Sequence, residues 1–316
     1  MRRRTRLAAA AARLSAPVWP SHLLFVKTKK CAGTTVALVV RRIARLANIS
    51  MFSVAPWEWS KSHPCASLIA HPPFRALIDT HPRHIGFSYE CSRTSLEPMV
   101  SAHMRGALAL TIVREPLARA LAAFYHFGVG FQQKPNTTAA KLAWLQKERD
   151  SLFQYIRRPA DRTPAAALAN YDVVLITERL DESMVRLRLR LGLPQHAVLY
   201  FDGKTSHGRS KDGVLRRPPH VPLAWEEPAF RDAAAAVVRG SADAELYALA
   251  VSAHERAVAA LQPKFADELG AFRTLLGEAR HACTRAAWRR SGRGTDGCYN
   301  HGRENGCLYT CLDGFK

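Results

Sequence analysis

The sequence predicts an α/β protein with a central parallel sheet flanked by helices. Short apolar runs typical of buried strands occur at Leu23–Val26, Leu108–Val113 and Val173–Thr177. Each run is followed by a segment whose apolar residues recur at helical spacing, and this alternation favours parallel strands covered by helices. With 316 residues, of which 47% are hydrophobic, the chain is long enough to bury such a core.

The first strand leads into a helix expected over Thr34–Leu46. Its apolar residues lie three and four positions apart, and Thr34 or Thr35 can cap its start. The next segment, residues 51–73, contains Pro, Trp and His and is expected to form a loop. A second short strand is expected at Ala76–Ile78.

The other elements follow the same alternation. Pro116 suits the first turn of a helix that runs to about Phe127, because proline is tolerated at that position. The remaining expected elements are a polar helix over 138–156, a helix that ends at Gly192, a short strand over Val198–Phe201 and an amphipathic helix over Ala242–Leu261.

Three regions are expected along the chain. Residues 1–20 are a disordered basic segment, residues 21–280 form the main domain, and residues 281–316 form a Cys-rich tail. No run of about 18 apolar residues occurs, so no transmembrane helix is predicted. The basic, Ala-rich start fits a weak signal sequence, a transit-like segment or an incomplete N-terminus.

Charge and cysteine content narrow the partners and the compartment. The net charge is +20 and the first acidic residue is Glu58, which favours polyanionic partners. The alternative is a GC-rich genome, which encodes Arg and Ala often. The spacing of Cys298, Cys307 and Cys311 does not match a zinc site, so paired disulfides are the expectation. Sequons at Asn48 and Asn136 are compatible with a secretory route.

A candidate anion site follows the first strand. The loop that enters the Thr34–Leu46 helix reads Lys-Lys-Cys-Ala-Gly-Thr-Thr over residues 29–35. A helix N-terminus offers unpaired N–H groups and a partial positive charge, Gly33 allows close approach, and the lysines add charge. A Walker loop has its Lys after the second Gly, whereas here Lys30 precedes Gly33, so an NTPase is disfavoured. A solvated basic turn is the alternative interpretation.

A second basic candidate lies at the end of another buried strand. The segment TIVREPLARALAAFYHF, residues 111–127, places Arg114 at the carboxyl end of Leu108–Val113. Ligands bind at that edge in open α/β sheets, and an Arg there can hold a phosphate bidentately. A salt bridge to Glu115 or to another acid is the alternative.

Four segments, in order over about residues 21–275, resemble Golgi carbohydrate sulfotransferases. FVKTKKCAGTTV resembles their 5′-phosphosulfate loop, and VREPLARALAAFYHF resembles their 3′-phosphate segment. YDVVLITERLDESMVRLRLRL and VLYFDGK are similar to later blocks of the galactose 3-O-sulfotransferase branch, which includes cerebroside (galactosylceramide) sulfotransferase.

The resemblance implies a P-loop-like sulfotransferase fold and a donor, 3′-phosphoadenosine-5′-phosphosulfate (PAPS). It implies transfer of a sulfuryl group to a carbohydrate hydroxyl, such as the galactose 3-OH of a glycolipid or glycan, by a membrane-associated Golgi glycoprotein. No metal and no nucleic-acid partner is expected. Lys30 would act at the bridging oxygen of the donor, where negative charge grows. The other donor-binding residues implied are Cys31, Ala32, Gly33, Thr34, Thr35, Arg114, Lys204 and Arg209.

The acceptor hydroxyl needs a base, for which the resemblance implies a histidine. His81 is favoured because it follows the expected strand at Ala76–Ile78, with His84 in reserve. His103 fits the family pattern by its letters, His-Met-Arg, but it directly precedes the strand that delivers Arg114, and we interpret it as a chance match.

The sequence departs from the family at two positions of the site. Lys29 stands where galactose-branch relatives carry His, and Ala122 stands where they carry Ser. A catalytically degenerate PAPS-binding homologue is therefore one alternative. The others are a basic nucleic-acid-binding protein and a P-loop kinase-like phosphotransferase.

Overall fold

The computed structural model describes residues 21–53, 76, 85–89, 91–201, 221, 223–291 and 311–312. Its centre is a five-stranded sheet with the strand order β2-β3-β1-β4-β5, in which every pair of neighbours is parallel. The strands are β1 (His22–Val26), β2 (Ser50–Ser53), β3 (Ile85–Tyr89), β4 (Leu108–Val113) and β5 (Val173–Ile176). The expected central parallel sheet is thereby confirmed.

The strand order creates a switch point between β1 and β4. After β1 the chain crosses to β2 at one edge of the sheet, whereas after β4 it continues to β5 at the other edge. Phe25 is in register with Leu110, so the two strands end side by side. Neighbouring strands whose connections leave in opposite directions open a crevice at their carboxyl ends, and such crevices bind ligands in open α/β sheets.

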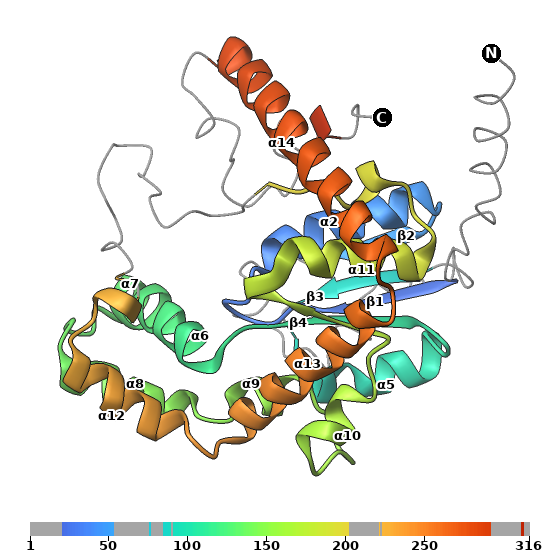
Figure 1. Cartoon of the computed structure of the whole chain (residues 1–316). Coiled ribbons are helices and arrows are strands. Elements are labelled where there is room, and N and C mark those ends of the chain that lie inside the picture. Colours follow the sequence, from blue (N-terminus) through green and yellow to red (C-terminus); the bar gives the residue numbers. More distant parts are fainter. Residues whose placement is uncertain are drawn as a thin grey trace, which may run out of the picture.

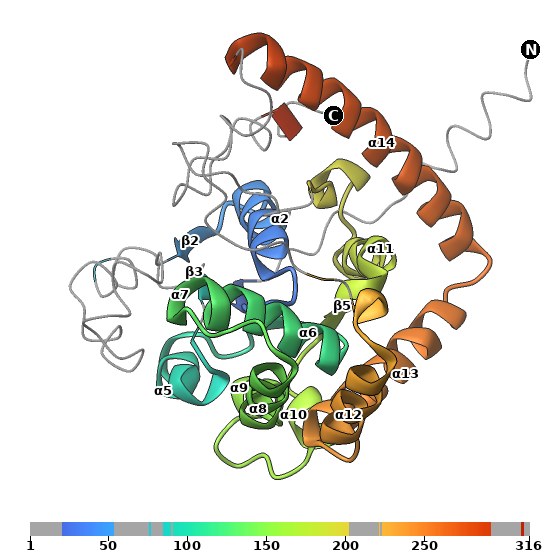
Figure 2. The same ribbon diagram turned by 90° about the vertical axis from the view of Figure 1, so that its left-hand side faces the viewer.

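Helices cover both faces of the sheet. Helices α2 (Gly33–Leu46) and α11 (Leu180–Leu191) lie on one face, and α5 (Arg93–His103), α9 (Ser151–Ile156) and α10 (Pro164–Leu168) lie on the other (Figures 1 and 2). The remaining longer helices are α6 (Pro116–Ala123), α8 (Thr138–Glu148), α12 (Pro228–Val238), α13 (Ala242–Ala259) and α14 (Lys264–Ser291). A π-helical segment, η2 (Phe124–Val129), continues α6.

Local sequence explains where the predicted helices begin and end. Helix α6 has Pro116 in its first turn, and the Glu115 side chain accepts hydrogen bonds from the first free N–H groups. Helix α11 ends at Gly192, which adopts the left-handed conformation that suits a helix C-terminus. The helices expected over Thr34–Leu46 and Ala242–Leu261 are confirmed as α2 and α13.

Three local predictions are wrong. The apolar segment Val198–Phe201 is not a strand, because a 3-10 turn, η4 (Gln195–Val198), leads into a buried stretch that joins no sheet. Ala76, the one described residue of the expected strand at Ala76–Ile78, is helical, and the strand that pairs with β1 on the side away from β4 is β3, later in the sequence. The single helix expected over 138–156 is two helices, because Asp150 adopts a left-handed conformation between α8 and α9.

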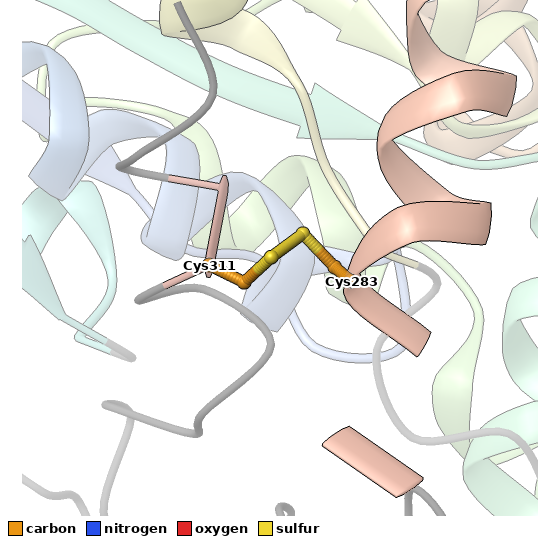
Figure 3. Close-up of a disulfide and its surroundings, with 2 residues drawn as sticks. All are labelled: Cys283 and Cys311. Atoms are coloured by element: carbon orange, nitrogen blue, oxygen red, sulfur yellow. A yellow bond between two sulfur atoms is a disulfide. The ribbon is translucent and has the colours of Figure 1, made fainter. Parts of the chain in front are cut away.

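The C-terminal part of the chain is joined to α14. This helix runs without a break through residue 281, where a separate tail was expected to begin. Cys283 on α14 forms a disulfide with Cys311 (Figure 3), and Cys91 is also disulfide-bonded. The expectation of paired disulfides is confirmed for these cysteines. The expected disorder of residues 1–20 concerns residues outside the described part of the chain.

A buried ion cluster joins α6 to the helices on its side of the sheet. The Arg119 guanidinium lies 3.1 Å from Glu148 and 3.3 Å from Asp243, and it donates to the Ser151 hydroxyl. Asp243 also accepts hydrogen bonds from the N–H groups that begin α9. Burial raises the pKa of Asp243 although Arg119 and these N–H groups oppose that effect. The second Arg of the REPLAR segment is therefore a core residue.

We expect Asp243→Ala to lower the free energy of unfolding by about 3–5 kcal/mol, because it leaves the buried Arg119 charge incompletely paired. Urea unfolding followed by circular dichroism measures this loss. The control is Glu255→Ala, which removes the acid of an exposed pair with Arg179 and should cost less than about 1 kcal/mol. Equal losses in the two variants would contradict the assignment.

Candidate functional site

The loop between β1 and α2 is fixed to the neighbouring strand at its base. The Thr28 hydroxyl donates to the carbonyl of Ile112, and the Thr111 hydroxyl donates to the carbonyl of Val26 at 3.1 Å. Lys27 and Thr28 are buried. The β1 end and the β4 end are thus held together by side chains as well as by the sheet.

Helix α2 presents its N-terminus at this point. Within the described residues no side chain caps it and its first turn contains no acid. Ala32 occupies the N-cap position with φ 55°, and Lys30 has φ 63°, so two residues of the loop are left-handed. The positive end of the helix dipole therefore favours an anion at this point.

Gly33 lies where the loop approaches itself most closely. A Cβ atom there would lie 2.8 Å from Cγ of Lys27 and 2.9 Å from the carbonyl oxygen of Thr28. The backbone oxygen cannot give way without a shift of the loop. Glycine is therefore the residue that fits this position, where the loop backbone packs tightly against the Lys27 stem and the Thr28 carbonyl.

Arg114 lies against the loop. Its Nη1 donates to the carbonyl oxygen of Lys30 at 3.1 Å, and its Nε lies 3.9 Å from Oε1 of Glu178, which follows β5. The side chain keeps 26% of its surface exposed. The structure therefore brings together the two basic segments that the sequence placed 84 residues apart.

The three lysines of the loop differ in their surroundings. Lys27 is buried, Lys30 is half-buried, and Lys29 is exposed with its ammonium 5.9 Å from the centre of the Phe127 ring. Phe127 belongs to η2, and its ring makes an edge contact with His126. Lys29 thus points toward the α6–η2 side of the loop.

Cys31 contributes its backbone to the loop. Its side chain is fully buried, and burial raises the pKa of the thiol to about 11 although Arg119 and Arg114 oppose that effect. The thiol donates weakly to the carbonyl of Lys29 at 3.5 Å. At neutral pH the thiol is therefore protonated, and in that form it is a poor nucleophile.

A cavity of about 360 Å³ lies beside the loop. It starts at Ala32 and continues along the beginning of α11 to Arg273 on α14. Its other lining residues are Thr177, Glu178, Arg179, Leu180, Asp181, Glu182 and Tyr200. The Asp181 carboxylate accepts hydrogen bonds from the Tyr200 hydroxyl at 2.6 Å and from Arg273 at 3.1 Å.

Sequence reasoning missed the carboxylates of this cavity. Glu178 follows β5, and its carboxylate accepts hydrogen bonds from the N–H of Glu115 and from the Tyr247 hydroxyl. Burial, together with Glu178, raises the pKa of Tyr247. Its position in the sequence could have identified Glu178, because it follows a buried strand closely, just as Arg114 does.

Of the predicted histidines and the basic loop near Lys204, the structure describes only His103. His103 ends α5, just before β4 begins. Because β4 spans about 20 Å at 3.3 Å per residue, His103 lies near the amino ends of the strands, whereas Lys30 lies near their carboxyl ends. Its interpretation as a chance match agrees with this position. His81, His84, Lys204 and Arg209 lie outside the described residues.

Searches against protein-family models, curated proteins and solved structures found no match for this chain. In the described part of the chain, no helix is long and apolar enough to span a membrane. The same residues contain no cluster of three His, Cys, Asp or Glu side chains that could hold a metal ion.

We expect Gly33→Ala to destabilise the protein by about 1–3 kcal/mol, because the added methyl group overpacks the loop against the Thr28 carbonyl. Thermal and urea unfolding measure the change. Gly270→Ala in α14 is the matched control, since a Cβ there meets no atom within 4 Å. That variant should be stabilised by about 0.5–1 kcal/mol, and a tolerated Gly33→Ala would exclude this tight packing.

Proposed function

We propose that this chain is a PAPS-dependent carbohydrate sulfotransferase of the galactose 3-O type that acts in the Golgi. The observation that carries the proposal is the contact between Arg114 and the Lys30 carbonyl at the switch point of the sheet. The donor bears phosphates at two ends. A sulfotransferase therefore needs two anion-binding groups within one ligand's length of each other, and these two groups meet that requirement.

The residues of the loop fit the sulfated end of the donor. The N–H groups of residues 31–35 and the hydroxyls of Thr34 and Thr35 would hold the 5′-phosphate at the uncapped start of α2. Lys30 would stabilise the negative charge that develops on the bridging oxygen as the S–O bond breaks. Transfer in line to the acceptor hydroxyl would then need no covalent enzyme intermediate.

Arg114 would bind the 3′-phosphate. The guanidinium has five N–H donors and gives one of them to the Lys30 carbonyl, so it can hold a phosphate while it supports the loop. Its distance of 3.9 Å from Glu178 is that of a loose ion pair, and an arriving phosphate would compete with that carboxylate.

The cavity beside Ala32 would hold the nucleoside between the two phosphates. Its volume of about 360 Å³ lies at the lower end of the range for small-molecule sites, and its lining is more polar than theirs. Carboxylates such as Asp181 and Glu182 in its wall disfavour phosphate but accept hydrogen bonds from hydroxyl and amino groups. The distribution of charge therefore suits a ligand with anionic ends and a neutral, donor-rich middle.

The acceptor side of the proposal rests on the sequence. His81 would act as the general base toward a carbohydrate hydroxyl, and the basic loop with Lys204 and Arg209 would close over the nucleotide. The acceptor proposed is the galactose of a glycolipid or glycan.

A thermal-shift comparison tests the donor class. We expect the desulfated donor product, 3′-phosphoadenosine-5′-phosphate (PAP), to raise the melting temperature, and ATP with Mg²⁺ to leave it unchanged. Stabilisation by ATP with Mg²⁺ alone would favour a kinase-like phosphotransferase. Salt-dependent DNA binding without a PAP shift would favour a nucleic-acid-binding protein.

We expect Lys30→Ala and His81→Ala each to abolish sulfuryl transfer from PAPS to galactosylceramide or lactose while the circular dichroism spectrum is retained. Lys30→Ala removes charge stabilisation of the leaving oxygen, and His81→Ala removes the base. The control is Lys134→Ala, an exposed lysine after η2 whose N–H, not its side chain, bonds to Gly128. Wild-type turnover in both site variants would refute the assignment. A wild-type chain that binds PAP without turnover would be the degenerate homologue.

A further inference from the structure

A fully buried histidine lies behind the wall of the cavity. His254, on α13, has 0% of its surface exposed, and both ring nitrogens have partners on α11. Its Nδ1 lies 2.6 Å from Nη1 of Arg186, and its Nε2 lies 3.1 Å from Oε2 of Glu182. The three residues form a chain that ends at the cavity, because Glu182 is one of its lining residues.

The partners fix the position of the proton on His254. A guanidinium has no lone pair to offer, so Arg186 must be the donor and Nδ1 the acceptor. The single ring proton therefore resides on Nε2, where it is donated to the Glu182 carboxylate. A second proton on Nδ1 would face the Arg186 N–H directly.

The surroundings of the ring keep this neutral form. Burial lowers the pKa of His254, and the positive charges of Arg186 and Arg179 lower it further, against the opposing effect of Glu182. The imidazole is thus a fixed hydrogen-bond donor to Glu182 rather than a counter-charge.

Glu182 is held at one of its two oxygens. Oε2 accepts from His254 and lies 3.9 Å from Nη1 of Arg179. For Oε1, no hydrogen bond is found within the described part of the chain, and the side chain keeps 25% of its surface exposed. A carboxylate that is oriented through one oxygen can use the other to accept a hydrogen bond from a ligand.

We propose that Glu182 binds a hydroxyl or amino group of the nucleoside in this cavity, and that His254 is the positioning residue that orients it. This inference rests on the proposed function, since it takes the donor's nucleoside as the ligand. Carboxylate acceptors bind such donors strongly, because the charge strengthens the hydrogen bond.

Titration calorimetry with PAP tests the inference on the whole chain. Glu182→Gln loses the carboxylate, and His254→Leu loses the N–H that orients it, so each should weaken PAP binding about tenfold or more. His254→Gln supplies both an N–H donor and a carbonyl acceptor and should bind PAP within about threefold of wild type. Glu255→Gln is the matched control on α13, because Glu255 pairs with Arg179 but does not line the cavity.

The outcomes separate the inference from the proposed function. PAP binding by wild type, together with unchanged binding by Glu182→Gln, overturns the inference and leaves the proposed function standing. Failure of wild type to bind PAP overturns both. If His254→Leu does not fold, the other two variants keep the inference falsifiable, since unchanged PAP binding by Glu182→Gln or a loss of binding in His254→Gln would overturn it.

Discussion

The hydrogen bond from Arg114 to the carbonyl of Lys30 is the contact on which the candidate site depends. It joins the loop after β1 to the end of β4, and the loose pair with Glu178 extends the connection to the end of β5. Three parallel strands thus end at one guanidinium. The Thr28 hydroxyl and the buried Cys31 side chain hold the same loop from the side of the core.

The charges around this contact differ between the loop and the cavity beside it. Lysine side chains, Arg114 and the α2 N-terminus attract anions, whereas the cavity beyond Ala32 has several carboxylates in its wall. A protein with a net charge of +20 would attract any polyanion at long range. Next to the basic loop, however, Glu178 and Asp181 stand beside Arg179 and Arg273 in the wall of the cavity, so the positive charge is not continuous there.

The sequence predicted the parts of the fold that have a strong local signal. Apolar runs located β1, β4 and β5, and helical spacing with Pro116 and Gly192 located the helices. The prediction of a strand over Val198–Phe201 was wrong, because an apolar segment can be buried by packing without pairing in a sheet. At the site, Arg114 and Arg119 belong to one short segment, yet only the contacts of the fold show that the first lies at the loop and the second in the core. The contact between His254 and Glu182 could not be predicted from the sequence, because the two residues are 72 positions apart and no local motif contains them both.

The loop conformation itself supports the candidate site. Lys30 and Ala32 are both left-handed, which disfavours each by about 1–2 kcal/mol relative to the right-handed region. Three contacts stabilise this conformation: the burial of the Cys31 side chain, the close packing at Gly33 and the hydrogen bond from Arg114. Backbone strain that is held by its surroundings is typical of ligand-binding loops. Here its result is that the lysines, the first N–H groups of α2 and Arg114 all lie at the switch point of the sheet.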